Sequence, residues 1–90
     1  MYYVYVLRSK KDMKLYTGFT SDLKKRFNEH NSQKVPSTKY RVPLEVIYYE
    51  VCGNMYDAQA REKYLKTAMG KRYLKNRLKY FFVSNGMEQK

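Results

Sequence analysis

The residues after the initial methionine form an uninterrupted run of aromatic and aliphatic side chains, Tyr2-Tyr3-Val4-Tyr5-Val6-Leu7. Such a run is typical of a strand buried on both faces, so the rest of the chain must supply apolar partners above and below it. A polar turn at residues 9–12 and a second extended segment from Leu15 to Gly18 follow. The two segments are predicted to pair as a hairpin in which Gly18 ends the second strand.

The middle of the chain changes from an extended to a helical pattern and back. Residues 22–31 are predicted to form a short helix, with Ser21 as its cap and an apolar pair at Leu23 and Phe27. The polar residues 32–43 contain both prolines and are expected to form an exposed loop. Residues 44–51 return to a strand pattern.

The last third of the chain is predicted to be helical. Asp57 is expected to cap a helix that ends near Gly70, and a third helix follows with an apolar face at Leu74, Leu78 and Phe81. The element order β-β-α-β-α-α predicts an α+β domain in which a small sheet is flanked by helices. Residues 1–83 are expected to form a single domain and residues 84–90 a flexible tail.

Charge is the compositional property that bears most on function. The chain has 19 Lys and Arg against 8 Asp and Glu, a formal net charge of +11, yet 43% of its residues are hydrophobic. This balance is typical of a folded basic domain that binds a polyanion, rather than of a disordered tail. The single cysteine, Cys52, excludes an internal disulfide and a zinc cluster, and no apolar run is long enough for a membrane span. A soluble cytoplasmic protein is expected.

Arg26 and His30, the only histidine, are spaced to share one face of the predicted helix. At 3.6 residues per turn their side chains lie roughly 40° apart around the axis, close enough to contact one anion. A guanidinium binds phosphate through two hydrogen bonds, and an imidazole orients it or transfers a proton. The alternative is an ordinary solvated helix face with a surface histidine.

Tyr5 and Tyr16 fall on the two strands of the predicted hairpin, where opposed or diagonal side chains on one face are close together. A phenol with a pKa near ~10 is a poor base, but nearby cations lower this value, and the chain is rich in cations. The alternative is that both rings only pack in the core, as most of the 11 tyrosines must.

Glu62 is the only acid among eight basic residues between Arg61 and Lys79. One interpretation is an ion pair with Lys66, one helical turn away. The other is a ligand for a divalent metal, because one carboxylate is enough for Mg²⁺, which keeps several waters and takes other ligands from substrate phosphate.

Taken together, "YYVYVL", "LYTGFTSDLKKRFNEHN" and "DAQAREKYLK" resemble the motifs of the GIY-YIG nuclease family, especially its small stand-alone bacterial members. The resemblance runs from Tyr2 to about Leu74. It implies a three-stranded antiparallel sheet flanked by helices and the hydrolysis of a phosphodiester bond with Mg²⁺ or Mn²⁺. DNA is favoured over RNA as the substrate, with a role in repair or recombination.

The same resemblance assigns roles to individual residues. Tyr5 is expected to activate the attacking water with support from Tyr16, and Arg26 to stabilise the charged phosphate. His30 is expected to orient the phosphate or help in proton transfer, and Glu62 to hold the metal. Gly18 belongs to the second motif and has a structural role.

The sequence departs from the family motifs at Tyr3 and Val4, which replace Gly and Ile, and at Thr17, which replaces Ile. Family members often carry a polar amide after the metal-binding Glu; Asn76 is the nearest candidate, and its spacing does not assign it. Sequence-independent contacts to the nucleic-acid backbone are expected from Lys24, Lys25, Lys39, Lys71, Arg72 and Lys75.

Targeting from a partner protein is one further expectation, because no second DNA-binding domain is recognisable. Two other functions remain as alternatives: a nucleic-acid-binding module without turnover, and a basic protein that binds anionic membranes through its third helix. The membrane alternative is disfavoured, because the apolar face of that helix suits a protein core.

Overall fold

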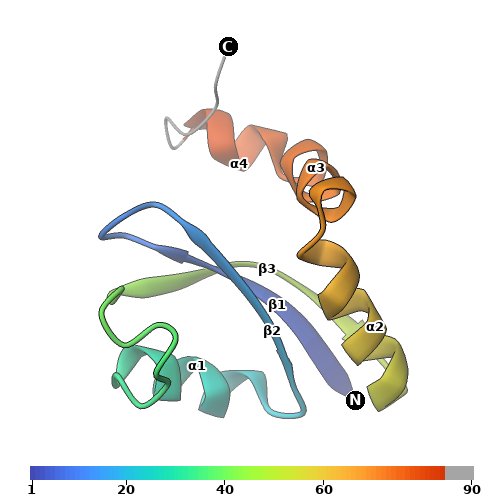
Figure 1. Ribbon diagram of the computed structural model, residues 1–90, viewed down its shortest axis with the longest axis horizontal. Coiled ribbons are helices and arrows are strands. Elements are labelled where there is room, and N and C mark those ends of the chain that lie inside the picture. The colour runs from blue at the N-terminus through green and yellow to red at the C-terminus, as the bar shows by residue number, and fades with distance from the viewer. Residues whose placement is uncertain (85–90) are drawn as a thin grey trace.

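A three-stranded antiparallel sheet lies at the centre of the computed structural model, which describes residues 1–84 (Figure 1). The strands are β1 (Tyr2–Ser9), β2 (Leu15–Thr20) and β3 (Leu44–Cys52), in the spatial order β2-β1-β3. The predicted hairpin, the third strand and the α+β class are therefore confirmed. Of the tail expected at residues 84–90, residues 85–90 lie outside the described residues, whereas Ser84 is the last residue of a helix and not part of a tail.

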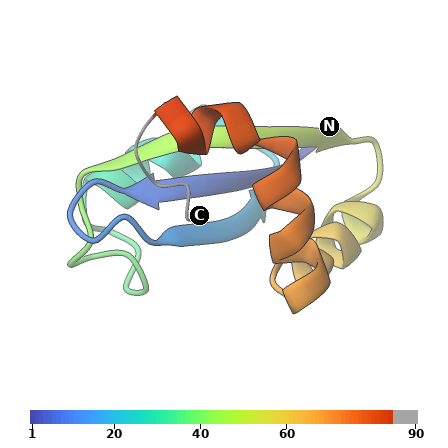
Figure 2. The ribbon, with the colours of Figure 1, turned by 90° about the horizontal axis from the view of Figure 1, so that it is seen from above.

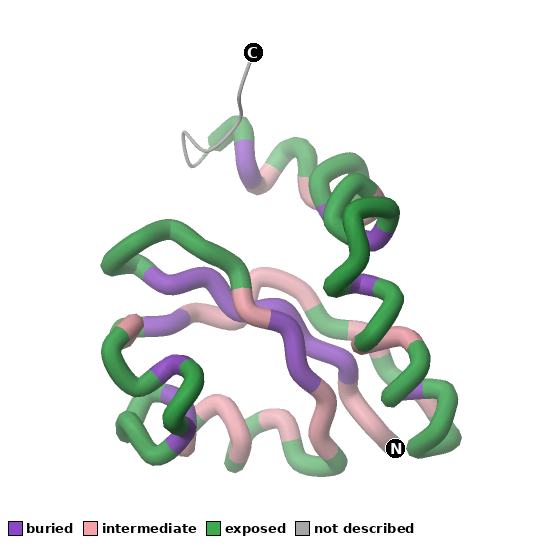
Figure 3. The backbone as a smooth tube through the Cα atoms, in the orientation of Figure 1, coloured by how far each residue is buried: buried purple, intermediate pink, exposed green. Residues whose placement is uncertain are grey.

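β1 is the central strand and is buried on both faces, as its sequence predicts (Figure 3). Val4 and Val6 point to one face and Tyr5 and Leu7 to the other, and each of the four is at most 2% exposed. Two separate cores therefore form, one on each side of the sheet.

The helices are divided between these two faces (Figures 1 and 2). Helix α1 (Leu23–Asn31) packs through Leu23 and Phe27 on the face that contains Tyr5. Helices α2 (Met55–Leu65) and α3 (Ala68–Arg77) cover the opposite face, and the short α4 (Lys79–Ser84) follows α3. Residues on β1 can therefore meet side chains from helices on either side of the sheet.

The capping residues of two helices differ from the sequence prediction. Asp22, not Ser21, caps α1, because its Oδ1 accepts a hydrogen bond from the Lys25 amide at 3.1 Å. Asn54, not Asp57, caps α2 by accepting from the Tyr56 amide at 2.8 Å. In both places an Asx side chain just before the first turn satisfies amides that have no partner within the helix.

Gly70 was predicted to end the second helix. It lies inside α3 instead. The chain leaves α2 at Leu65, and Thr67 caps α3 by accepting from the Gly70 amide at 3.1 Å. A Cβ built at Gly70 would lie 2.0 Å from the carbonyl oxygen of Tyr64. The glycine therefore allows the two helices to approach at their junction, rather than terminating either of them.

The expected third helix is divided at Leu78, whose backbone leaves the helical region with φ −112° and ψ 25°. Leu74 is 2% exposed and belongs to the core, so the apolar face of α3 packs against the sheet and is not free for a lipid surface. No helix within residues 1–84 combines the length and apolar character that a membrane crossing needs.

Candidate active site

The hydroxyl group of Tyr5 is the centre of the candidate site. It lies 2.9 Å from Nε2 of His30, on α1. In the sheet, Tyr5 is paired with Gly18 and Leu7 with Tyr16, so the two tyrosines are diagonal neighbours on one face, as predicted. A Cβ at Gly18 would lie 2.5 Å from the Tyr5 hydroxyl oxygen. The Tyr5 phenol therefore occupies the space that a side chain at position 18 would fill. Gly18 lies within β2 and does not end it, contrary to the prediction.

His30 is fully buried, at 0% exposure, which contradicts the alternative of a surface histidine. Its two ring nitrogens are both engaged: Nε2 with Tyr5, and Nδ1 with Oγ1 of Thr38 at 2.7 Å. One nitrogen donates and the other accepts, because a neutral imidazole carries a single proton. His30 therefore connects a strand, a helix and the loop before β3, and does not present a ring to solvent.

Burial, with the positive charge of Arg26 adding to it, lowers the pKa of His30 from 6.5 to about 4. The imidazole is thus neutral at physiological pH. Its folded pKa lies below its unfolded pKa, so the unfolded chain binds more protons between these values. The stability that His30 contributes is fully present above pH 6.5 and declines as the pH falls toward 4.

We expect the free energy of unfolding, measured in urea, to fall by about 1 kcal/mol between about pH 7 and about pH 5.5, because His30 is the titrating histidine. His30→Gln keeps a hydrogen-bonding side chain that does not titrate, and should show a nearly flat profile over the same interval. A wild-type profile as flat as that of the variant would contradict the buried, neutral imidazole.

Burial also raises the pKa of Tyr5 above its usual value of 10.0. Arg26 opposes this rise, whereas the negative charges of Tyr16 and Glu62 would add to it. The expectation that cations lower the pKa of this phenol is therefore wrong, because desolvation outweighs the single guanidinium nearby. Tyr5 is 2% exposed and keeps its proton.

Tyr16 has a different environment from Tyr5. Its side chain is half-buried, its ring centre lies 5.2 Å from that of His30, and its hydroxyl oxygen accepts a hydrogen bond from Ser37 at 2.9 Å. Ser37 and Thr38 come from the segment expected to be only an exposed loop, and Thr38 is fully buried. In the sequence, the only indication that this segment contributes to the site is the pair of hydroxyl residues after Pro36, which is a weak signal.

Arg26 lies one turn before His30 on α1 and is partly exposed. Its Nη1 donates to Oε1 of Glu29 at 3.0 Å, and this carboxylate, together with Tyr5, raises the pKa of the guanidinium. Glu29 therefore restrains a cation that also acts on the Tyr5 hydroxyl. The predicted juxtaposition of Arg26 and His30 is present, with the arginine at the surface and the histidine beneath it.

Glu62 approaches from α2, on the other side of the sheet, and is close enough for its charge to act on Tyr5. Its side chain is 17% exposed and pairs with Lys66 at 2.8 Å, so the predicted ion pair is confirmed. No group of three potential metal ligands (His, Cys, Asp or Glu) occurs within residues 1–84. A single carboxylate of this kind fits a Mg²⁺ ion that keeps most of its water and takes further oxygens from a phosphate.

The basic residues predicted to contact nucleic acid do not form one patch. Lys71 and Lys75 lie beside Tyr16 in a groove, whereas Lys24 lines a separate hollow near Tyr3. The other three, Lys25, Lys39 and Arg72, are exposed outside both hollows, as is Asn76. The groove adds Lys14, which the sequence does not single out, and Lys66, which was predicted only as the ion-pair partner of Glu62.

The chain is similar in sequence to known proteins. Residues 1–76 match the model of the GIY-YIG catalytic domain. The UPF0213 protein CPE1444 of Clostridium perfringens is 43% identical over 67 residues, which cover 73% of this chain and 71% of that protein. The UPF0213 protein SpyM50708 of Streptococcus pyogenes serotype M5 is 45% identical over 65 residues, 71% of this chain and 70% of that protein.

No solved structure gives a significant match. The family model nevertheless spans the three strands, α1, α2 and most of α3, and thus every residue gathered around the Tyr5 hydroxyl. The chain therefore belongs to the GIY-YIG family, a superfamily of nucleases.

Proposed function

We propose that this protein is an endonuclease that hydrolyses phosphodiester bonds in nucleic acid, DNA rather than RNA, with Mg²⁺ or Mn²⁺ as its cofactor. The observation that carries the proposal is the convergence on one buried hydroxyl. His30 contacts the Tyr5 hydroxyl, Gly18 leaves room for it, and the charges of Arg26 and Glu62 act on it from opposite sides of the sheet. A packing role for Tyr5 requires none of these charges.

Phosphodiester hydrolysis needs neutralised phosphoryl oxygens, an oriented water and a stabilised leaving oxygen. Arg26 is restrained by Glu29 and partly exposed, and it would neutralise charge on the phosphoryl oxygens. Glu62 would hold the divalent cation, which when bound supplies Lewis-acid stabilisation of the leaving oxygen. To do so, Glu62 must exchange its ion pair with Lys66, and the released ammonium remains at the same surface.

Tyr5 and Tyr16 have different roles in the proposed mechanism. Tyr5 is buried and its pKa is raised, so its role is to position Arg26 and His30 rather than to take a proton from water. Tyr16 is the phenol with access to solvent, and its hydroxyl oxygen accepts the hydrogen bond from the attacking water. The water oxygen forms the new bond to phosphorus, the bond to the leaving oxygen breaks, and the proton passes to solvent.

The experiment is cleavage of supercoiled plasmid, a single strand, a flap and a branched junction, in Mg²⁺, Mn²⁺ or chelator. Tyr16→Phe is expected to slow metal-dependent cleavage by about 10²-fold, in line with the loss of a group that orients the attacking water. Tyr56→Phe, at a tyrosine that is 71% exposed on α2, is the matched control and should cleave like wild type. Equal rates for all three proteins would indicate a contaminating nuclease.

If none of the substrates is cleaved in either metal, the endonuclease proposal fails. Salt-sensitive binding that persists without cleavage would then support the alternative, a nucleic-acid-binding module on the same fold.

A further inference from the structure

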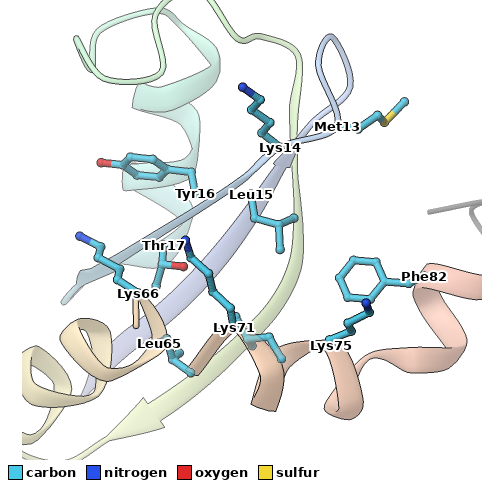
Figure 4. A pocket seen from close by; sticks show the side chains of 11 residues that line it. Met13, Lys14, Leu15, Tyr16, Thr17, Leu65, Lys66, Lys71, Lys75 and Phe82 are labelled. Carbon is cyan, nitrogen blue, oxygen red and sulfur yellow. The ribbon is translucent and has the colours of Figure 1, made fainter. Parts of the chain in front are cut away.

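A groove of about 620 Å³ opens beside the candidate active site, between β2 on one side and α2, α3 and α4 on the other (Figure 4). This volume is within the range of roughly 300–1,000 Å³ that is usual for ligand pockets. Figure 4 shows Leu15, Leu65 and Phe82 directed into the space between the strand and the helices. The walls of the groove are therefore largely apolar.

Lysines surround this apolar surface. Lys14, Lys66, Lys71 and Lys75 line the groove, and no carboxylate within residues 1–84 lines it with them. Lys66 is paired with Glu62, whereas Lys14, Lys71 and Lys75 make no ion pair with another described residue. A polyanion is thus the complementary occupant, and it must also offer an apolar face.

An unpaired nucleotide has this combination of properties. Its base presents an aromatic face to leucine and phenylalanine side chains, and its phosphates meet the ammonium groups. A base within a duplex is stacked on its neighbours and presents only its edges, so a duplex would leave the apolar walls of this groove unused. A lipid surface requires an exposed convex apolar face instead of a hollow.

The groove is continuous with the candidate active site through two residues. Tyr16 lines the groove and its ring contacts that of His30, and Lys66 lines the groove and pairs with Glu62. A nucleic-acid strand that occupies the groove would therefore pass beside the Tyr16 hydroxyl and the Glu62 carboxylate.

We propose that this groove binds unpaired nucleotides, so that the substrate class is nucleic acid with a single-stranded segment next to the cleaved bond. The statement about cleavage rests on the proposed function, whereas the binding site stands without it. Phe82 and Leu15 provide the surface for bases, and Lys71 and Lys75 hold the backbone.

Binding is measured by fluorescence anisotropy in chelator, where no cleavage occurs, with three labelled probes: a short oligothymidylate, the same backbone without bases, and a blunt duplex. Wild type is expected to bind the oligothymidylate about tenfold more tightly than either other probe, which corresponds to about 1.4 kcal/mol. Equal affinity for the oligothymidylate and the abasic backbone would overturn the proposal, because the apolar walls would then contribute nothing.

Lys71→Ala/Lys75→Ala should weaken oligothymidylate binding by about tenfold and remove most of the preference over duplex. Lys24→Ala/Lys25→Ala removes the same charge from α1, outside the groove, and should weaken all three probes alike. Circular dichroism establishes that both variants are folded. Equal losses from the two pairs, or tighter binding of polyglutamate or anionic vesicles than of the oligothymidylate, would contradict the assignment.

The binding proposal and the endonuclease proposal can be refuted independently by these experiments. Selective binding of the oligothymidylate without cleavage of any substrate would leave the groove assigned and the endonuclease proposal refuted. Cleavage with no preference among the binding probes would give the reverse result.

Discussion

Replacing Glu62 with glutamine is expected to reduce metal-dependent cleavage by at least about 10³-fold, the equivalent of roughly 4 kcal/mol of lost stabilisation of the reacting phosphate. The charge of Glu62 acts on the Tyr5 hydroxyl. Glutamine keeps the size of the side chain but removes the negative charge that a divalent cation requires. The measurement is the initial rate of plasmid nicking at the lowest Mg²⁺ concentration that saturates the wild-type protein, with circular dichroism to establish that the variant is folded.

Two comparisons make the result specific. Asp57→Asn removes a negative charge from an exposed position on the same helix and should leave the nicking rate unchanged. Raising the Mg²⁺ or Mn²⁺ concentration should restore part of the activity of Glu62→Gln if the carboxylate acts through the metal. Wild-type rates in Glu62→Gln at low metal concentration would remove Glu62 from the proposed mechanism.

Gly18→Ala is expected to destabilise the protein by about 1–3 kcal/mol, the usual cost of overpacking a core, and to reduce cleavage strongly. The new methyl carbon would lie 2.5 Å from the hydroxyl oxygen of Tyr5 and 2.7 Å from the ring carbon that bears it. The ring is held by the hydrogen bond to His30 and by surrounding core residues, so it cannot simply turn away. Urea unfolding gives the loss of stability, and the nicking assay gives the loss of activity.

Gly53→Ala is the matched control, because a Cβ at that position meets nothing within 4 Å. A double variant, Gly18→Ala/Tyr5→Phe, identifies the contact responsible. Removing the hydroxyl relieves the closest approach, so the two substitutions should cost less together than the sum of the single variants. If the losses of stability were strictly additive, the cost of Gly18→Ala would not come from its contact with the Tyr5 hydroxyl.

Much of the fold is predictable from the chain because its strongest patterns are local. The run from Tyr2 to Leu7 identifies the central strand, and the spacing of Leu23 and Phe27 identifies the first helix and its buried face. The positions of caps and helix ends are less predictable, because several polar residues compete for each end. Gly70 illustrates the limit: its role depends on a carbonyl oxygen in a different helix, which no local pattern records.

The candidate site likewise contains features that the sequence predicts and features that it does not. The diagonal relation of Tyr5 and Tyr16 follows from strand pairing, and the sharing of a helix by Arg26 and His30 follows from their spacing. Burial does not follow from spacing, so the depth of His30 and the raised pKa of Tyr5 emerge only in the folded protein. Thr38 lies in an irregular segment and becomes significant only through its contact with His30.

The single histidine of this chain gives the protein a built-in spectroscopic reporter. Because His30 is sealed between Tyr5 and Thr38, one set of imidazole NMR signals, free of overlap from any other histidine, reports which nitrogen carries the proton. The same enclosure should protect the ring from histidine-modifying reagents until the protein opens. Reaction with such a reagent would therefore time the opening of the site, and would do so without any labelled residue or substrate.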